Sequence, residues 1–164
     1  MSSLPSVCTT RRVLAAGGLL TSFSVAVSGC GTGAVEAPAP RPPAEVAARC
    51  RALHDRLPRK VHGFARRATT PESPLVTAWG SPAIVVRCGM PRPAALKPTS
   101  ELVVVNGVSW LGVPADRPVT FTAVGRLAYV EVTVPAAYQP PGDVLIELAG
   151  PIKAAIPASP DGSL

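Results

Sequence analysis

The sequence predicts an α+β domain in which an N-terminal helix, linked by a disulfide, packs on a mostly antiparallel β-sheet and a short C-terminal helix follows. Three observations predict this class. Apolar residues recur at the helical period in one segment, later segments are rich in β-branched residues between turn signals, and two cysteines remain for pairing inside the domain. The domain is organised around residues 79–89, where a short apolar run ends in Arg87 and Cys88.

Length and composition indicate one small domain preceded by a targeting segment. The 164 residues include 20 prolines and 14 glycines, which favour turns and linkers over long helices. The formal net charge is +6, and removal of Arg11 and Arg12 with the targeting segment leaves 14 basic against 10 acidic side chains. This surplus favours an anionic cell-envelope component or lipid headgroups as partners. Nucleic-acid binding is not expected, because no aromatic residues are interleaved with a basic stripe.

Residues 1–29 have the layout of a lipoprotein signal peptide. Two arginines precede the apolar residues 13–27, a stretch shorter than the roughly 20 residues that a membrane-spanning helix needs. The closing Val27-Ser28-Gly29-Cys30 resembles the lipobox of bacterial lipoproteins. This resemblance implies that Cys30 receives a diacylglycerol and becomes the first residue after cleavage, so that two acyl chains anchor the protein in the membrane.

The signal leaves two questions open. In the alternative interpretation Cys30 is incidental, and the peptide is an ordinary secretory signal that yields a secreted protein. The adjacent Arg11 and Arg12 also resemble a twin-arginine export signal, and the sequence does not decide between that route and the general secretory one. We expect the protein on the extracytoplasmic face of the cell membrane, with the lipid on Cys30 as its anchor.

The remaining chain divides into three segments. Residues 30–43 consist of small residues and alternating prolines, which favour a polyproline tether that packs no core. A single α+β domain is expected over residues 44–156. A disordered tail is expected over residues 157–164.

Residues 44–57 are predicted to form a helix, with Pro43 in its first turn and Pro58 beyond its end. One face carries the apolar residues Val46, Cys50, Leu53 and Leu57. Cys50 therefore points inward, where it can pair with Cys88 in an oxidising compartment. Such a bridge closes a loop of about 39 residues, which contributes roughly 4 kcal/mol in the chain-entropy model. A redox pair is the alternative, but the Cys-x-x-Cys spacing is absent.

The sheet is predicted from a series of short segments. Asn106-Gly107 lies between two β-rich runs and favours a two-residue hairpin turn. In the last strand, apolar residues alternate with polar ones, so one face is buried. Asp143 can cap a final helix over 144–149, which resumes after Gly150-Pro151. The predicted strands are residues 61–68 at an edge, 76–79, 83–88, 102–105, 108–111, 119–124 and 127–134.

Three separated motifs resemble an actinobacterial family of exported proteins that carries only the label domain of unknown function 3515. They are the segment 78–89, Asn106-Gly107-Val108-Ser109-Trp110, and Gly125-Arg126 leading into Tyr129-Val130-Glu131-Val132. The resemblance spans about residues 46–150. It implies an envelope location, and it implies no activity, substrate or ligand.

The sequence favours a non-catalytic protein. Ser109 stands in a Gly-x-Ser-x-x-Gly spacing on a predicted hairpin, which is not the strand-to-helix turn of a nucleophile elbow. His54 and His62 are the only histidines and have no carboxylate cluster beside them, so neither a metal site nor a cofactor is expected. Catalytic residues are therefore not assigned. The alternatives are an envelope hydrolase with an unrecognised site and a purely structural spacer lipoprotein.

Five residues at strand ends or turns are candidates for ligand binding by an accessory module. Arginine suits a carboxylate or phosphate, and tryptophan offers a flat apolar contact for sugars or peptide. The ligand would be an anionic envelope component or a protein partner. The alternative is that both tryptophans lie in the core and that Arg87 forms an internal ion pair. The candidates are Trp79, Arg87, Arg92, Trp110 and Arg126.

Overall fold

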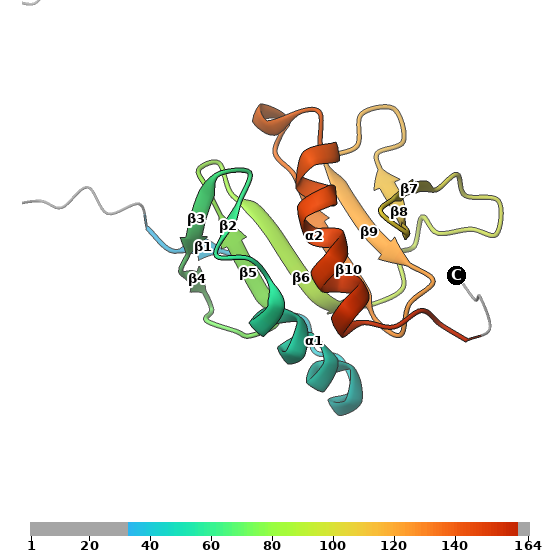
Figure 1. Cartoon of the computed structure of the whole chain (residues 1–164), viewed down its shortest axis with the longest axis horizontal. Helices are drawn as coiled ribbons and strands as arrows, with labels where there is room; N and C mark the ends of the chain where they lie inside the picture. Colours follow the sequence, from blue (N-terminus) through green and yellow to red (C-terminus); the bar gives the residue numbers. More distant parts are fainter. Residues whose placement is uncertain (1–32, 161–164) are drawn as a thin grey trace, which may run out of the picture. The chain divides into compact units, whose positions relative to one another are not determined.

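The computed structural model describes residues 33–160, so the predictions for the signal peptide and Cys30 lie outside the described residues. An eight-stranded sheet forms the centre of this part, and each strand runs antiparallel to its neighbours (Figure 1). In spatial order its strands are β2 (Lys60–Val61), β3 (Phe64–Arg67), β5 (Val76–Trp79), β6 (Ile84–Met90), β10 (Tyr129–Thr133), β9 (Thr120–Val124), β8 (Val108–Val113) and β7 (Val103–Val105).

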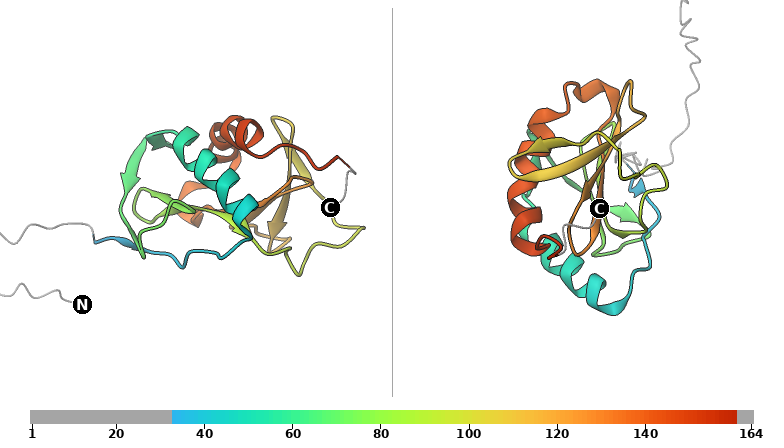
Figure 2. Two further views of the ribbon diagram at one scale, coloured as in Figure 1. Left: turned by 90° about the horizontal axis from the view of Figure 1, so that it is seen from below. Right: turned by 90° about the vertical axis from the view of Figure 1, so that its right-hand side faces the viewer.

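Both long helices cover the same face of the sheet. α1 (Ala44–Arg56) and α2 (Gly142–Ala155) lie side by side there, and the extended residues 33–43 run along the opposite face (Figure 2). A short 3-10 helix, η1 (Ala136–Tyr138), leads from β10 into α2. This arrangement confirms the predicted α+β class, with a helix near each end of the domain and a largely antiparallel sheet. None of the helices in the part described is long and apolar enough to cross a membrane.

The disulfide between Cys50 and Cys88 is confirmed and joins α1 to β6. The two Cα atoms lie 5.5 Å apart, and the side chains are 1% and 2% exposed. Leu53 is equally buried, as the apolar period predicts. The helix ends at Arg56, two residues before Pro58, and the guanidinium of Arg66 donates to the carbonyl oxygens of the last turn, which have no partner within the helix.

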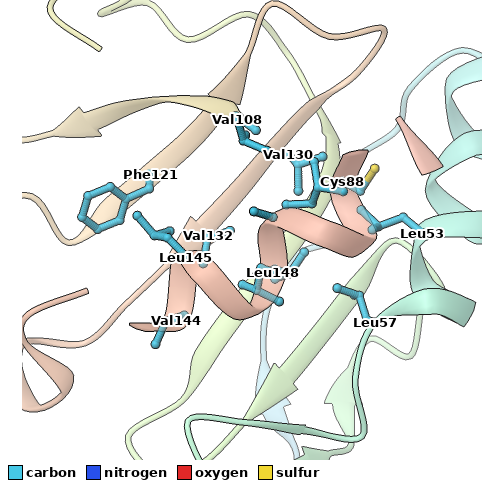
Figure 3. Close-up of a cluster of buried hydrophobic side chains, with 14 of the residues drawn as sticks. Leu53, Leu57, Cys88, Val108, Phe121, Val130, Val132, Val144, Leu145 and Leu148 are labelled. Atoms are coloured by element: carbon cyan, nitrogen blue, oxygen red, sulfur yellow. The ribbon is translucent and has the colours of Figure 1, made fainter. Parts of the chain in front are cut away.

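The main core lies between the helices and the sheet. Leu145 and Leu148 of α2 lie over Val130 and Val132 of β10, where alternate residues of each strand face the helices (Figure 3). Nearly all of these side chains are fully buried, and burying one such aliphatic side chain contributes about 1.5–3 kcal/mol. The core therefore consists mainly of valine, leucine and isoleucine, in agreement with the low aromatic content.

Two hairpins have two-residue turns in which both residues have positive φ. The predicted turn at Asn106-Gly107 is confirmed, with φ values of 48° and 76°. Residues 61–68, predicted as one edge strand, instead form the hairpin of β2 and β3. His62 and Gly63 have φ values of 50° and 80°, so a second two-residue turn reverses the chain where a continuous strand was expected.

Three boundaries differ from the prediction. Residues 33–43 do not form a free tether, because β1 (Val35–Glu36) pairs in parallel with β4 (Thr69–Thr70) and Ala37 is buried. The start of the predicted tail is also paired, since Ser159 donates its N–H to the carbonyl of Gly125. Backbone hydrogen bonds hold both segments even though they contain few large apolar side chains. The final helix runs through Pro151 without a break, because buried residues on both sides of the proline pack on the sheet.

Candidate functional site

A cavity among the described residues lies on the sheet face opposite the helices (Figure 2). It has a volume of about 590 Å³ and is bounded on one side by residues 38–43, which we call the strap. The end of β6 and the turn that precedes β10 form the other side. We call it the strap cavity.

The strap is fixed at both ends. On the N-terminal side, Ala37 donates its N–H to the carbonyl of Thr70 at 3.0 Å, next to the β1–β4 pair. On the C-terminal side, Pro42 packs on Gly89, whose φ is +88°. A Cβ atom at Gly89 would lie 2.6 Å from Cγ of Pro42, so the close approach of the strap requires glycine there.

Arg126 lines the strap cavity with its guanidinium partly buried. Its Nη1 donates to the carbonyl of Ile156 at 2.8 Å and its Nη2 to that of Gly107 at 3.0 Å. Its Nε is buried without a hydrogen-bond partner in the structure. Burial also lowers the pKa of Arg126, because removal from water disfavours the charged form. A buried donor without an acceptor is costly.

Arg87 and Arg41 provide two further guanidinium groups. Arg87 on β6 lies opposite Glu131 on β10 and forms an ion pair with it, with Nε 3.0 Å from Oε1. Arg41 belongs to the strap and is exposed, and it makes no hydrogen bond or ion pair with any residue between 33 and 160. Of the three arginines that line the cavity, Arg41 is therefore the one whose full guanidinium is available to a ligand.

The rest of the lining is apolar. Prolines of the strap, Val46, Met90 and Leu127 provide most of this apolar surface. Tyr129 contributes the hydroxyl group of the lining. No Asp, Glu, His, Cys, Ser, Thr or Lys is among the described residues that line it. The site thus combines positive charge with apolar surface, and it contains neither a carboxylate nor an activated nucleophile. This combination suits an anion that carries an apolar body.

The structure brings together only some of the five predicted ligand-binding residues. Arg87 and Arg126 line the strap cavity, but Trp79 and Trp110 are 0% exposed and do not line it. Trp79 donates from Nε1 to the carbonyl of Pro58 inside the core. Neither tryptophan offers a ring face to a ligand, because the alternation of each strand turns the ring toward the helices. The structure thus matches the alternative prediction, in which both tryptophans lie in the core and Arg87 forms an internal ion pair.

Arg92 has a different environment from the other candidates. Its Nη2 donates to the carbonyl of Leu96 and its Nη1 to the hydroxyl of Tyr129 at 3.3 Å, so it fastens the loop that follows β6. It does not line the strap cavity. Sequence reasoning also missed Arg41, because the alternating prolines around it indicated a free tether. The proline pattern did predict the extended conformation that the strap adopts.

A second cavity of about 420 Å³ lies near the end of α1. Nδ1 of His54 is 3.0 Å from Oγ1 of Thr77, which resembles a base beside a hydroxyl. Burial and then the charge of Arg66 lower the pKa of His54, and the nearby Asp55 opposes this shift. Thr77 lines this cavity but is only 5% exposed. Within residues 33–160, no three His, Cys, Asp or Glu side chains come together as metal ligands would.

Comparison with known proteins identifies a family. A family model described as "Protein of unknown function (DUF3515)" matches residues 12–161, which include the whole described domain. The match confirms the family resemblance seen in the three sequence motifs, and it assigns no activity. Neither the curated proteins nor the solved structures contain a match.

Proposed function

Since the chain belongs to the DUF3515 family of proteins of unknown function, we propose its role from the site itself. We propose a non-catalytic binding module, anchored to the extracytoplasmic face of the cell membrane, that takes an anionic ligand with an apolar body into the strap cavity. The observation that carries the proposal is the lining, in which three arginines and apolar side chains occur without a carboxylate.

Electrostatics supports an anionic ligand. A carboxylate or phosphate that enters this cavity meets the guanidinium groups of Arg41 and Arg126 and no negative side chain in the lining. Hydrogen bonds to a charged group contribute about 1.5–3 kcal/mol each, which exceeds the contribution of neutral ones. The prolines and Leu127 then favour ligands whose remaining atoms are apolar, because their burial releases water from both surfaces.

The lining also supports binding rather than catalysis. General acid–base chemistry and covalent catalysis both need a titratable or nucleophilic side chain within hydrogen-bond reach of the substrate. Of the side chains around the cavity, Tyr129 is the nearest to this description, and its hydroxyl already accepts a hydrogen bond from Arg92. We therefore favour a binding module over an envelope hydrolase.

Replacing Arg41 by glutamine tests the anion site. We expect Arg41→Gln to weaken binding of N-acetyl-leucine by about tenfold, which corresponds to the roughly 1.4 kcal/mol at the lower end of a charge-assisted hydrogen bond. Isothermal titration calorimetry with the purified full chain measures this. N-acetyl-leucinamide is the matched neutral probe of nearly equal size, and we expect it to bind weakly and equally to both proteins.

Arg51→Gln is the control variant for this test. Arg51 is exposed on α1, does not line the strap cavity and loses the same charge on substitution, so we expect binding of N-acetyl-leucine to stay within twofold of the wild type. If Arg41→Gln and Arg51→Gln weaken binding of N-acetyl-leucine equally, the effect comes from the net charge of the protein and not from the cavity. Equal binding of the acid and the amide would contradict an anion site altogether.

The membrane anchor rests on the lipobox-like Val27-Ser28-Gly29-Cys30. We expect the native protein in the membrane fraction, with mass spectrometry placing a diacylglycerol on an N-terminal Cys30. Cys30→Ala should prevent addition of the lipid. The variant should therefore lack the stable membrane attachment that two acyl chains provide. Wild-type protein found in the medium with an unmodified Cys30 would instead identify an ordinary secreted protein.

A further inference from the structure

We propose that the ligand of the strap cavity is an extended peptide whose free carboxylate lies among the arginines and whose chain follows the strap toward Glu36. This inference rests on the proposed function, because it uses the same anion site. It adds the class of the ligand, its direction and a second residue that recognises it.

The middle of the strap lines two cavities. A third cavity of about 360 Å³ shares residues 38–41 with the strap cavity and is otherwise lined by Glu36, Thr70 and Pro71. The two cavities have no other lining residue in common. The two cavities therefore adjoin along the middle of the strap, which is held at its ends. A ligand too long for the strap cavity can continue along the strap into the third cavity.

The strap backbone has unused hydrogen-bonding capacity. Its prolines have no N–H to donate, and no backbone hydrogen bond joins residues 38–42 to any other described residue. The carbonyl groups of these residues and the N–H groups of Ala39 and Arg41 are therefore available. Extended peptides are commonly recognised by such main-chain groups together with pockets for side chains. Four strap residues at about 3.1 Å each span roughly 12 Å, the length of an extended peptide of about four residues.

The charged side chains are distributed unevenly along the two cavities. Arg87 and Arg126 lie on the side of the strap cavity, and Arg41 lines both cavities. Glu36 is exposed and is the one carboxylate among the described residues that line either cavity. A linear molecule with a carboxylate at one end and an ammonium group at the other matches this pattern. A short peptide with free termini has that charge pattern, whereas an anionic lipid or a simple phosphate lacks the positive end.

Tetraalanine and its two blocked forms provide the test. With the purified full chain, we expect calorimetry to show tetraalanine binding at least fivefold more tightly than N-acetyl-leucine. Amidation of the C-terminus should weaken binding about tenfold or more, because it removes the anion. Acetylation of the N-terminus should weaken it about threefold to fivefold, as expected for loss of one exposed ion pair.

Glu36→Gln tests whether the N-terminal ammonium group of the peptide lies beside Glu36. We expect this variant to bind tetraalanine as weakly as the wild type binds the acetylated peptide, and to show no further loss on acetylation. Glu101→Gln is the control, because Glu101 is also exposed and lines neither cavity, and it should bind all three peptides like the wild type.

The outcomes separate this inference from the proposed function. If amidation weakens binding but acetylation and Glu36→Gln have no effect, the anion site stands and the peptide inference is overturned. The same conclusion follows if tetraalanine binds no more tightly than N-acetyl-leucine. If neither amidation nor Arg41→Gln changes binding, the proposed anion site itself is overturned.

Discussion

Removing the disulfide by a double Cys50→Ala and Cys88→Ala replacement is expected to lower the free energy of unfolding by about 4 kcal/mol. The bridge joins residues 38 apart in the sequence and holds α1 on β6, so its loss restores much conformational freedom to the unfolded chain. A loss of this size is a large part of the 5–15 kcal/mol that typically separates folded from unfolded domains. Urea unfolding of the full chain, followed by circular dichroism, measures it.

Reduction of the wild-type protein gives the matched control for this prediction. A reductant removes the bridge without the small cavity that alanine leaves, so the reduced protein should be destabilised by a similar or slightly smaller amount. The double variant should not respond to reductant. A loss below about 1 kcal/mol in both experiments would mean that packing alone holds α1 in place.

Trp79→Ala is expected to destabilise the domain by about 3–5 kcal/mol. The indole is 0% exposed, its Nε1 donates to the carbonyl of Pro58 at 3.2 Å, and the guanidinium of Arg66 lies 6.0 Å from the ring centre. Alanine would remove the apolar volume of the indole. It would also remove the hydrogen bond to the Pro58 carbonyl and the ring beside the Arg66 guanidinium. Denaturant unfolding followed by the fluorescence of the remaining Trp110 measures the change.

Trp79→Phe separates volume from hydrogen bonding at the same position. Phenylalanine keeps most of the apolar contact but has no donor for the Pro58 carbonyl, so a loss of only about 1–2 kcal/mol is expected. Ligand binding should be unchanged in the folded phenylalanine variant, because Trp79 does not line the strap cavity. Equal losses for alanine and phenylalanine would show that the hydrogen bond, rather than packing, dominates this position.

Much of the fold is predictable because it depends on local patterns. The period of Val46, Cys50, Leu53 and Leu57 predicted α1 and the inward direction of Cys50, and the structure confirms both. Asn106-Gly107 predicted its hairpin, because few residue pairs adopt two successive positive φ values easily. His62-Gly63 makes a comparable turn, but a histidine in that position carries a much weaker signal, and the hairpin of β2 and β3 was missed.

The site was only partly predictable from the sequence. Arginines at strand ends identified Arg87 and Arg126, yet the same reasoning included two tryptophans that the structure buries completely. The burial of these two tryptophans depends on which face of the sheet the helices cover. No local sequence pattern predicts that face. Arg41 was missed for the opposite reason, since a proline-rich segment with few apolar residues has no sequence pattern that indicates docking.

The sequence by itself determined the fold class, most strands, the first helix and the pairing of Cys50 with Cys88, because these follow from periodicity, turn chemistry and the number of cysteines. The tertiary structure alone decided that residues 38–43 close over one sheet face and create a cavity there. That arrangement depends on distant contacts, of Pro42 with Gly89 and of Ala37 with Thr70, whose partners lie more than 30 residues away. Such contacts form only when the completed sheet presents its open face to the strap, and so no segment encodes them alone.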